Sequence, residues 1–309
     1  MSDPLTVSQG VIDLTFHQVR ASPRSHRPSN ERAPLTCSQV VAAVVRAVLA
    51  EHGVTVSEVI SKPHEQAFID LREGRTQILV GWLPGSHETY LGPFRSDVVV
   101  LGEAEGAPAV YDPYCIWGVP DYVPEETVRS ILDLAKPEVA AKFVRTVQGI
   151  NPGAGISRFS KEIIAKYGLD LQFVEGDIPK CTQAFEDAYA KKGEQTRSAR
   201  VRERLTCYVS RTVEWVVVPL WHPQYLHAKY KIRALDDPDD LLRAHKPDAA
   251  RIIVAKTLAA RLSPETIESL RKLRITNEGV ARMDYLHAIQ GLSPDEAAAR
   301  WIQETGFQL

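Results

Sequence analysis

Cysteine is scarce in this sequence, and no two cysteines are spaced as a redox or metal-binding pair. The four cysteines, at positions 37, 115, 181 and 207, form no C-x-x-C motif among the 309 residues. This spacing excludes zinc-ribbon and thioredoxin-type sites, which require closely paired cysteines. We expect most of the four to be buried thiols, and the sequence alone does not decide whether any of them pair as disulfides.

Long hydrophobic runs and an excess of one charge are also missing. The longest apolar stretch beside a motif, residues 215–221 (WVVVPLW), is far too short to cross a bilayer. With 37 Lys and Arg against 39 Asp and Glu, the net charge is −2, so no overall field favours nucleic acid or an anionic membrane. We expect a soluble chain with no nucleic-acid partner. The start of the chain, residues 1–5 (MSDPL), has neither the basic region nor the apolar run of a secretory signal, so we expect none.

The usual signatures of catalysis, nucleotide binding and metal binding are absent too. Nine histidines occur, but none form H-E-x-x-H, and His222 and His227 are five residues apart rather than three or four. There is no G-x-S-x-G, no P-loop, no G-x-G-x-x-G and no local signature around Cys115. We therefore expect no bound metal, no cofactor and no enzymatic activity.

What the sequence does contain is an alternation of strands and helices. Its length predicts two domains or one large α/β unit. In the first part, the apolar periodicity predicts strands at 11–16, 54–60 and 78–82, with helices around 40–49 and 65–72 between them. This β-α-β-α-β order predicts a parallel sheet whose ligand crevice lies beyond the carboxyl ends of its strands.

The rest of the chain is expected to repeat this alternation and to end in helices. Further strands are predicted at 97–101, 116–119, 171–174 and 213–218. Helices are predicted at 125–147, at 183–192 and from 237 onward. Ser263 and Ser293, each followed by proline, are predicted helix N-caps. The whole pattern favours two α/β lobes that face one another across a cleft.

Aromatic residues make up only 7% of the chain, yet they gather at the predicted strand ends. In residues 81–90 (GWLPGSHETY) and 221–225 (WHPQY), a strand delivers Trp, a proline follows two residues later, and a Tyr comes within eight residues. Segment 111–122 (YDPYCIWGVPDY) adds four more aromatic residues. Taken by itself, Trp82 is better interpreted as a core residue than as a ligand contact, because Trp is highly buried on average. A position in the core does not, however, require the Trp, Pro and Tyr pattern that the two segments share.

Several aromatic faces at one cleft suit a quaternary ammonium ion. Such a cation has a permanent charge, no N–H to donate and a methylated surface, so aromatic rings match it better than a carboxylate does. Each cation–π contact contributes roughly 0.5–2 kcal/mol when desolvated, and three or four ring faces then support micromolar binding. The alternative use of such rings is stacking on bases or sugars. Nucleic acid also requires a basic groove, against which the near-neutral composition argues.

Two further features are candidates for contacts with an anionic group. Residues 149–155 (GINPGAG), which include Asn151, precede a predicted helix. Glycines in this place either direct backbone N–H groups at an anion or form a tight turn that needs a positive φ, and the sequence leaves both open. His17 ends the first predicted strand, from which its imidazole would donate to a ligand carboxylate; a core or surface role is the alternative.

Several motifs together resemble those of a known protein family. They are residues 81–90, 149–156 (GINPGAGI), 221–225, 228–230 (AKY) and 235–238 (LDDP). In sequence, order and spacing they resemble the glycine betaine/choline/carnitine substrate-binding proteins of ABC transporters. The resemblance runs from about residue 11 to the last predicted helix, and it is specific to the family rather than to one ligand.

This resemblance implies an α/β fold of the two-lobed type II periplasmic-binding-protein kind, with the ligand cleft between the lobes. Residues 1–113 and 221–309 would form lobe one, and residues 114–220 would form lobe two. The lobes would close over a zwitterion whose trimethylammonium head enters an aromatic cage. Its carboxylate would meet polar groups and backbone amides.

The resemblance also assigns ligand-binding residues by motif position. Trp82 and Trp221 are the expected cage walls, with His87 and Tyr90 supporting the first. The residues expected near the second wall are His222 and Tyr225. The glycine loop with Asn151 would lie on the opposing lobe. The candidates by composition alone are Tyr114, Trp117 and Tyr122.

The function implied is that of a non-enzymatic, monomeric binding protein that delivers glycine betaine or a related quaternary ammonium compound to an ABC permease in the periplasm. The missing signal, the Arg-rich loop 20–34 and the long stretch 193–211 depart from the family's usual pattern. The alternative is a cytoplasmic sensor, or a diverged binding module of the same fold with another small zwitterion; an enzyme using the cleft is a third class. Glycine betaine, choline, carnitine and proline betaine share the cationic head, so the sequence does not choose among them.

Overall fold

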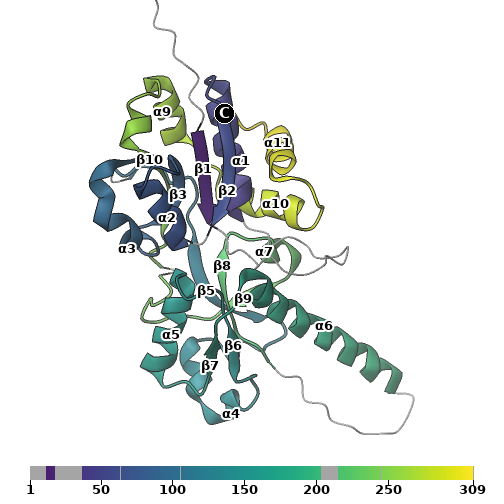
Figure 1. Ribbon diagram of the computed structural model, residues 1–309. Helices are drawn as coiled ribbons and strands as arrows, with labels where there is room; N and C mark the ends of the chain where they lie inside the picture. Colours follow the sequence, from purple (N-terminus) through teal and green to yellow (C-terminus); the bar gives the residue numbers. More distant parts are fainter. Residues whose placement is uncertain are drawn as a thin grey trace, which may run out of the picture. The chain divides into compact units, whose positions relative to one another are not determined.

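The computed structural model describes residues 12–17, 37–62, 64–104, 106–202, 215–243 and 245–308, with 12–17, 57–62 and 193–202 described by their backbone alone. The chain forms two compact units (Figure 1). Unit 1 contains residues 1–113 and 248–309, and unit 2 contains residues 114–247. Cys207, the loop 20–34 and residues 203–211 lie outside the described residues.

Unit 1 is built on a five-stranded sheet with the order β2-β1-β3-β10-β4. Its strands are β1 (Ile12–His17), β2 (Val56–Lys62), β3 (Ile78–Leu83), β4 (Val98–Val100) and β10 (Ala249–Ala255). The pairs β1·β2 and β1·β3 are parallel, which confirms the predicted β-α-β-α-β opening. Strand β10 is antiparallel to both of its neighbours and lies in a region predicted to be helical. That prediction is wrong because a short apolar run has no periodicity that separates a buried strand from a helix.

Helices cover both faces of this sheet. Successive residues of a strand point to opposite faces, so neighbouring residues of β3 pack into different cores. On one face, Ile78 and Val80 share a buried core with α1 (Cys37–Glu51), α9 (Pro264–Lys272), α10 (Asn277–Ala288) and α11 (Pro294–Thr305). On the other face, Leu79 and Leu83 pack with α2 (His64–Arg72), α3 (Glu88–Leu91) and the 3₁₀ helix η1 (Gly92–Asp97). The short α8 (Lys256–Ala259) follows β10.

The two predicted N-caps begin α9 and α11. The Ser263 hydroxyl accepts a hydrogen bond from the Thr266 N–H at 3.1 Å. Ser293 forms a capping box with Glu296, in which the Ser293 side chain accepts from the Glu296 N–H and the Glu296 carboxylate accepts from the Ser293 N–H. Both caps satisfy backbone donors that the first helical turn leaves without an intrahelical partner, and both predictions are confirmed.

Unit 2 contains a three-stranded sheet with the order β8-β5-β9 and a parallel pair, β6 and β7. The strands are β5 (Tyr114–Pro120), β6 (Thr146–Gln148), β7 (Gln172–Val174), β8 (Val218–His222) and β9 (Ile232–Ala234). The helices are η2 (Ile131–Ala135), α4 (Pro137–Ala140), α5 (Gly155–Tyr167), α6 (Ile178–Arg202) and α7 (Leu226–Lys229). The predicted strand at 171–174 and the helix at 183–192 are present.

Two expectations about unit 2 need correction. Residues 125–147 contain only the short helices η2 and α4, because Lys136, which precedes a proline, is extended and separates them. The second boundary between the units lies at 247/248 rather than at 220/221. Residues 221–247 stay with unit 2 because β8 and β9 are both hydrogen-bonded to β5, which places the return to unit 1 directly before β10.

Candidate functional site

Trp82 is the second-to-last residue of β3, where the chain is about to leave the sheet of unit 1. Its indole packs against the α1 side of the core and is half-buried. The indole Nε1 donates a hydrogen bond to the hydroxyl of Tyr111 at 2.9 Å. Burial raises the pKa of Tyr111 well above its usual value, so its hydroxyl keeps its proton. Packing and this hydrogen bond together fix the orientation of the ring.

Two hydrogen bonds join His87 to Trp82 across a tight turn. The Trp82 N–H donates to Nδ1 of His87 at 2.9 Å, and the His87 N–H donates to the Trp82 carbonyl at 2.9 Å. The two rings stack at 5.9 Å between centroids and 21° between planes. His87 is buried, with Phe68 and the half-buried Tyr90 near its ring at 5.5 and 6.4 Å. Because Nδ1 accepts, the neutral imidazole carries its proton on Nε2.

Asp248 holds the turn between these two residues, and no motif in the sequence pointed to it. Its carboxylate accepts from the Gly85 N–H at 2.5 Å, from the Ser86 N–H at 3.0 Å and from the Ser86 hydroxyl at 2.6 Å. Asp248 is 8% exposed and directly precedes β10, more than 160 residues along the chain from the turn. No local pattern reveals a contact across that distance.

Trp221 is likewise the second-to-last residue of its strand, β8, so the predicted likeness between the two Trp segments extends to their place in the sheets. It lies opposite Cys115 of β5 and is buried, 7% exposed. Its carbonyl accepts from the side-chain amide of Gln224 at 2.8 Å and lies 3.2 Å from Nε2 of His227. The turn after β8 is therefore closed on the Trp221 backbone, as the turn after β3 is closed on Trp82.

Tyr114 and His222 face each other as partners across β5 and β8. Their rings stack at 5.2 Å with 19° between the planes. The ring of His227 meets His222 edge-on at 4.7 Å. Burial, with a smaller contribution from His222, lowers the pKa of His227 to about 4, so the His227 imidazole is neutral at pH 7. The structure thus brings together Trp221, His222 and Tyr114 in unit 2.

The remaining aromatic candidates differ in their surroundings. Trp117 is fully buried in β5, and its Nε1 donates to the Ser160 hydroxyl at 2.9 Å, so it is a core residue and we do not carry it into the cage. The hydroxyl of Tyr122 donates to the Ala188 carbonyl at 3.2 Å, which attaches it to α6. Tyr225 is half-buried and precedes α7.

His17 and Asn151 remain predictions. His17 is the last residue of β1, and its side chain lies outside what the structure describes. Asn151 is half-buried in the loop before α5, where its carbonyl accepts from the Ala154 N–H at 3.2 Å.

The glycine loop 149–155 does not use its glycines as a left-handed turn. Gly149, Gly153 and Gly155 all lie within the described residues, and none has a positive φ. At Gly149 the reason is space, because a Cβ there would overlap the ring of Phe173. A turn that needs a positive φ therefore does not explain these glycines, and at Gly149 close packing against Phe173 does.

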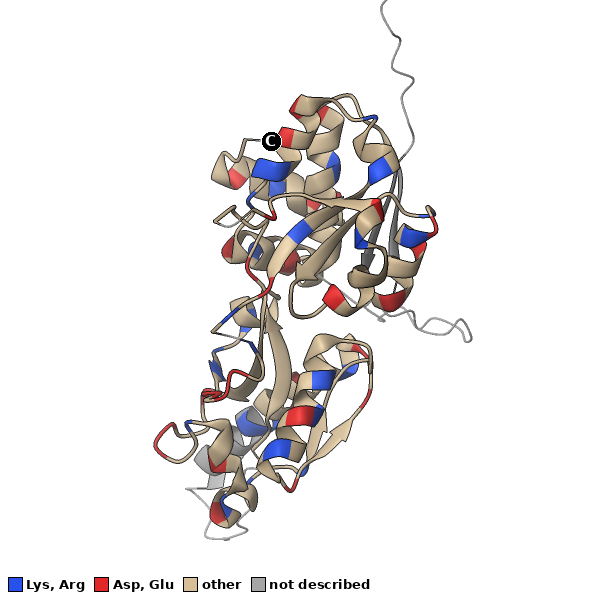
Figure 2. Cartoon of the chain, turned by 90° about the vertical axis from the view of Figure 1, so that its left-hand side faces the viewer, with Lys and Arg blue, Asp and Glu red and all other residues tan. Residues whose placement is uncertain are grey.

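Within the part of the chain that the structure describes, neither the distribution of charge nor the grouping of metal-ligating side chains indicates a second functional site. Lys and Arg alternate with Asp and Glu over both units (Figure 2). Among the described residues, no group of three His, Cys, Asp or Glu side chains is arranged to hold a metal ion. Cys37, Cys115 and Cys181 are buried thiols. No helix in the described ranges is both long and apolar enough to span a bilayer.

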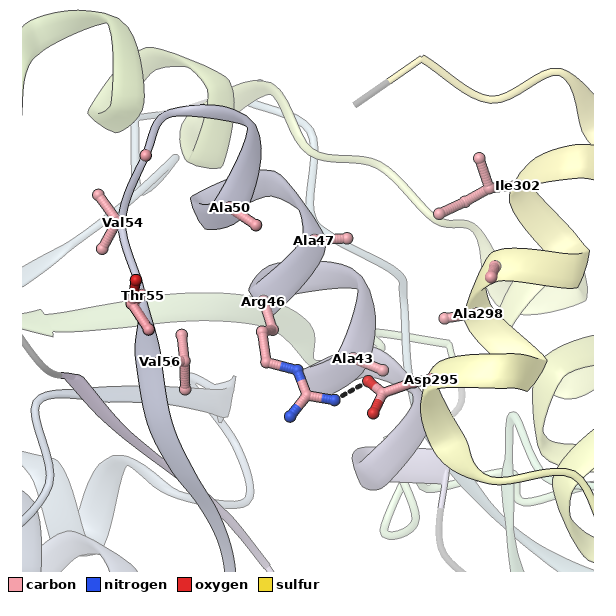
Figure 3. A pocket seen from close by; sticks show the side chains of 12 residues that line it. Ala43, Arg46, Ala47, Ala50, Val54, Thr55, Val56, Asp295, Ala298 and Ile302 are labelled. Carbon is pink, nitrogen blue, oxygen red and sulfur yellow. Dashed lines mark ion pairs between the residues drawn. The ribbon is translucent and has the colours of Figure 1, made fainter.

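A separate groove in unit 1 shares no lining residue with the Trp82 turn (Figure 3). It lies between α1, the start of β2 and α11, and an ion pair joins Arg46 to Asp295 within it. Alanines from both helices, together with Val54, Val56 and Ile302, form most of its lining. It offers no aromatic ring face to a quaternary ammonium ion.

The family of the chain follows from comparison with known proteins. Residues 32–195 and 209–304 match the family described as the substrate binding domain of the ABC-type glycine betaine transport system. The chain belongs to this family. This match confirms the resemblance found in the motifs. The members of the family are binding proteins of transport systems and not enzymes. A comparison with curated proteins gave no match.

Solved structures show the same fold. Lactococcal OpuAC, crystallised closed with glycine betaine, has a TM-score of 0.69 and 21% sequence identity over 96% of each chain. The glycine betaine/L-proline-binding protein ProX from Borrelia burgdorferi has a TM-score of 0.69 and 18% identity over 94% of this chain and 93% of its own. A choline-binding protein in complex with choline has a TM-score of 0.63 and 16% identity, over 95% and 89%. The fold is thus that of the type II periplasmic binding proteins.

Proposed function

We propose that this protein binds glycine betaine or a related quaternary ammonium compound through an aromatic cage. The observation that carries the proposal is the common arrangement of the two Trp segments. Trp82 and Trp221 each occupy the second-to-last position of a strand, and each is followed by a turn bonded to its own carbonyl. Membership of the family supports the class of ligand.

The chemistry of a quaternary ammonium ligand favours aromatic rings over carboxylates as its binding groups. A trimethylammonium group offers no N–H to a carboxylate, and its charge is spread over methyl groups that water solvates weakly. The face of a Trp or Tyr ring presents negative potential to such a cation and at the same time buries its apolar surface. Trp82 is held by Tyr111, and His222 is stacked on Tyr114, so the rings are ordered in the protein itself. Pre-ordered groups lose less entropy on binding.

In this proposal Trp82 and Trp221 are the cage walls, with His87 and Tyr90 supporting the first. His222, Tyr114 and Tyr225 lie near the second, and the loop containing Asn151 contacts the carboxylate end of a zwitterion. The protein acts as a monomer outside the cytoplasm and delivers its ligand to an ABC permease. Family membership supports this partner and this compartment.

A titration of the ligand-stripped protein tests the proposal. Glycine betaine, choline and carnitine are compared with an isostere in which carbon replaces the quaternary nitrogen and the positive charge is lost, with calorimetry and Trp fluorescence as the readouts. We expect saturable micromolar binding of at least one cation and none of the isostere. Equal binding of cation and isostere, or no binding of any compound, would contradict the cage.

The permease is tested separately by co-purification from a strain that carries both components. We expect the liganded protein to associate with the permease more tightly than the ligand-stripped protein does. Equal association of the two forms would contradict delivery to the permease and would have no bearing on the proposed cage.

A further inference from the structure

The end of β3 and the turn that follows it are hydrogen-bonded to the two segments by which the chain leaves and re-enters unit 1. Asp248 is the first residue of unit 1 after the chain returns from unit 2, and its carboxylate accepts three hydrogen bonds from Gly85 and Ser86. Tyr111, which accepts from the Trp82 indole, is two residues before unit 1 ends at Pro113. The turn therefore meets the returning segment, and Trp82, three residues before the turn in β3, meets the outgoing one.

These two segments are also joined to each other beside Trp82. The Ala250 N–H donates to the Tyr111 carbonyl at 3.0 Å, and the Val110 N–H donates to the Ala250 carbonyl at 3.0 Å. In the sheet, Ala250 is the register partner of Trp82. Trp82, Tyr111 and Ala250 thus form one hydrogen-bonded group, and Asp248 connects that group to the turn leading to His87.

We infer that Asp248 is a positioning residue for ligand binding, whose carboxylate orders the Gly85–Ser86 turn before the ligand arrives. This inference rests on the proposed function, because it concerns the site that contains Trp82 and His87. A carboxylate that accepts from two backbone N–H groups and a hydroxyl makes charge-assisted hydrogen bonds, which are roughly twice as strong as neutral ones. An amide at this position loses one of the two acceptor oxygens and turns an N–H toward another donor.

The expected effect on affinity follows from the population of the ordered turn. If only a fraction of the protein has the binding geometry, the apparent Kd rises by the inverse of that fraction. A variant in which about one molecule in ten keeps the ordered turn would therefore bind about tenfold more weakly. The loss would lie mainly in the association rate, because the ligand meets a competent protein less often.

The experiment compares Asp248→Asn, Asp248→Ala and Asp248→Glu with Asp112→Ala. Asp112 is a matched control, since it also lies beside a boundary of unit 1 and pairs with Arg274 at 2.7 Å but makes no contact with the turn. Stopped-flow Trp fluorescence and calorimetry are recorded well below each variant's Tm, with the cation that wild type binds best. We expect about tenfold weaker binding and slower association for Asn and Ala, partial recovery for Glu, and wild-type behaviour for Asp112→Ala.

A second measurement needs no ligand. Nitrogen NMR of the His87 imidazole, assigned with a His87→Asn variant, reports the Nδ1 acceptor state that the ordered turn imposes. We expect Asp248→Asn to shift this signal toward a mixture of tautomers and Asp112→Ala to leave it unchanged. Wild-type rates together with a wild-type His87 signal in Asp248→Asn would overturn the inference. If wild type binds none of the cations, the proposed function fails, and the NMR comparison still decides whether Asp248 orders the turn.

Discussion

Trp82 and His87 exchange two hydrogen bonds, from the Trp82 N–H to Nδ1 of His87 and from the His87 N–H to the Trp82 carbonyl, each at 2.9 Å. The imidazole therefore acts as part of the turn and not only as a ring beside the ligand site. A buried N–H that loses its acceptor costs about 1–3 kcal/mol.

Replacing His87 tests this relationship. His87→Phe keeps a flat ring but removes the acceptor, and we expect it to lower the free energy of unfolding by about 1–3 kcal/mol. In His87→Asn the side-chain oxygen stands near the place of Nδ1, so we expect most of the stability to return. Urea unfolding measures both variants. Equal stability of His87→Phe and wild type would show that the hydrogen bond contributes nothing.

The two proposed cage walls are tested by substitution with a matched core control. Trp82→Ala and Trp221→Ala each remove one ring face, which at roughly 0.5–2 kcal/mol per contact raises the Kd by about 2- to 30-fold. Trp→Phe at either position should lose less, because a ring remains. Trp117→Phe is the control, since Trp117 is fully buried against Ser160. We expect Trp117→Phe to lower the Tm and leave the Kd unchanged. A raised Kd in Trp117→Phe, with an unchanged Kd in Trp82→Ala and Trp221→Ala, would place Trp117 in the cage and the other two outside it.

His227 predicts how stability depends on pH. Its pKa is about 4 in the folded protein, below the ordinary value of 6.5, so between these values the unfolded chain binds more protons. The free energy of unfolding therefore falls as the pH is lowered from about 6.5 to 4, by about 2 kcal/mol at pH 5. Urea unfolding at pH 7 and pH 5 measures this loss.

The matched variants for this measurement are His227→Gln and His245→Gln. Most of the loss between pH 7 and pH 5 should disappear in His227→Gln, because the titrating group is gone. His245 is exposed in the same unit, and its replacement should leave the wild-type loss in place. An unchanged pH dependence in His227→Gln would show that another group is responsible.

Gly149 predicts an overpacking defect with a specific rescue. A Cβ at this position overlaps the ring of Phe173, so we expect Gly149→Ala to lower the free energy of unfolding by about 1–3 kcal/mol. Phe173→Leu, which shortens the opposing side chain, should recover part of that loss when combined with Gly149→Ala. Calorimetric melting of the two single variants and the double variant gives the coupling, and additive effects would contradict the contact.

Local patterns predicted the parts of the fold that depend on nearby residues. Strands β1 to β3, the caps at Ser263 and Ser293, and the place of both Trp residues near strand ends all follow from spacing over fewer than about 15 residues. The same patterns failed at β10, because a strand buried on both faces of its sheet has no alternation of polar and apolar positions. They also failed at residues 125–147, where Ser130 and Pro137 divide a helical composition into short turns.

The candidate site was predicted in its aromatic residues but not in what supports them. The concentration of rings at strand ends pointed to Trp82 and Trp221 and included Trp117, which the structure places in the core. Composition does not distinguish a ring at a strand end from one that a helix covers. Asp248 is held by contacts across more than 160 residues, so only the folded chain brings it to the turn.

The position of β10 between β3 and β4 bears on the order in which the chain folds. Unit 2 is a continuous stretch, residues 114–247, whereas unit 1 needs β10, which is synthesised after unit 2 is complete. Until then β3 and β4 lack the strand that joins them, and Trp82 and Ala250 cannot meet. Because domains fold as units during synthesis, we expect unit 2 to fold first, while one edge of β3 and one edge of β4 stay unpaired until β10 has been made. We therefore expect unit 1, whose synthesis begins first, to complete its fold last.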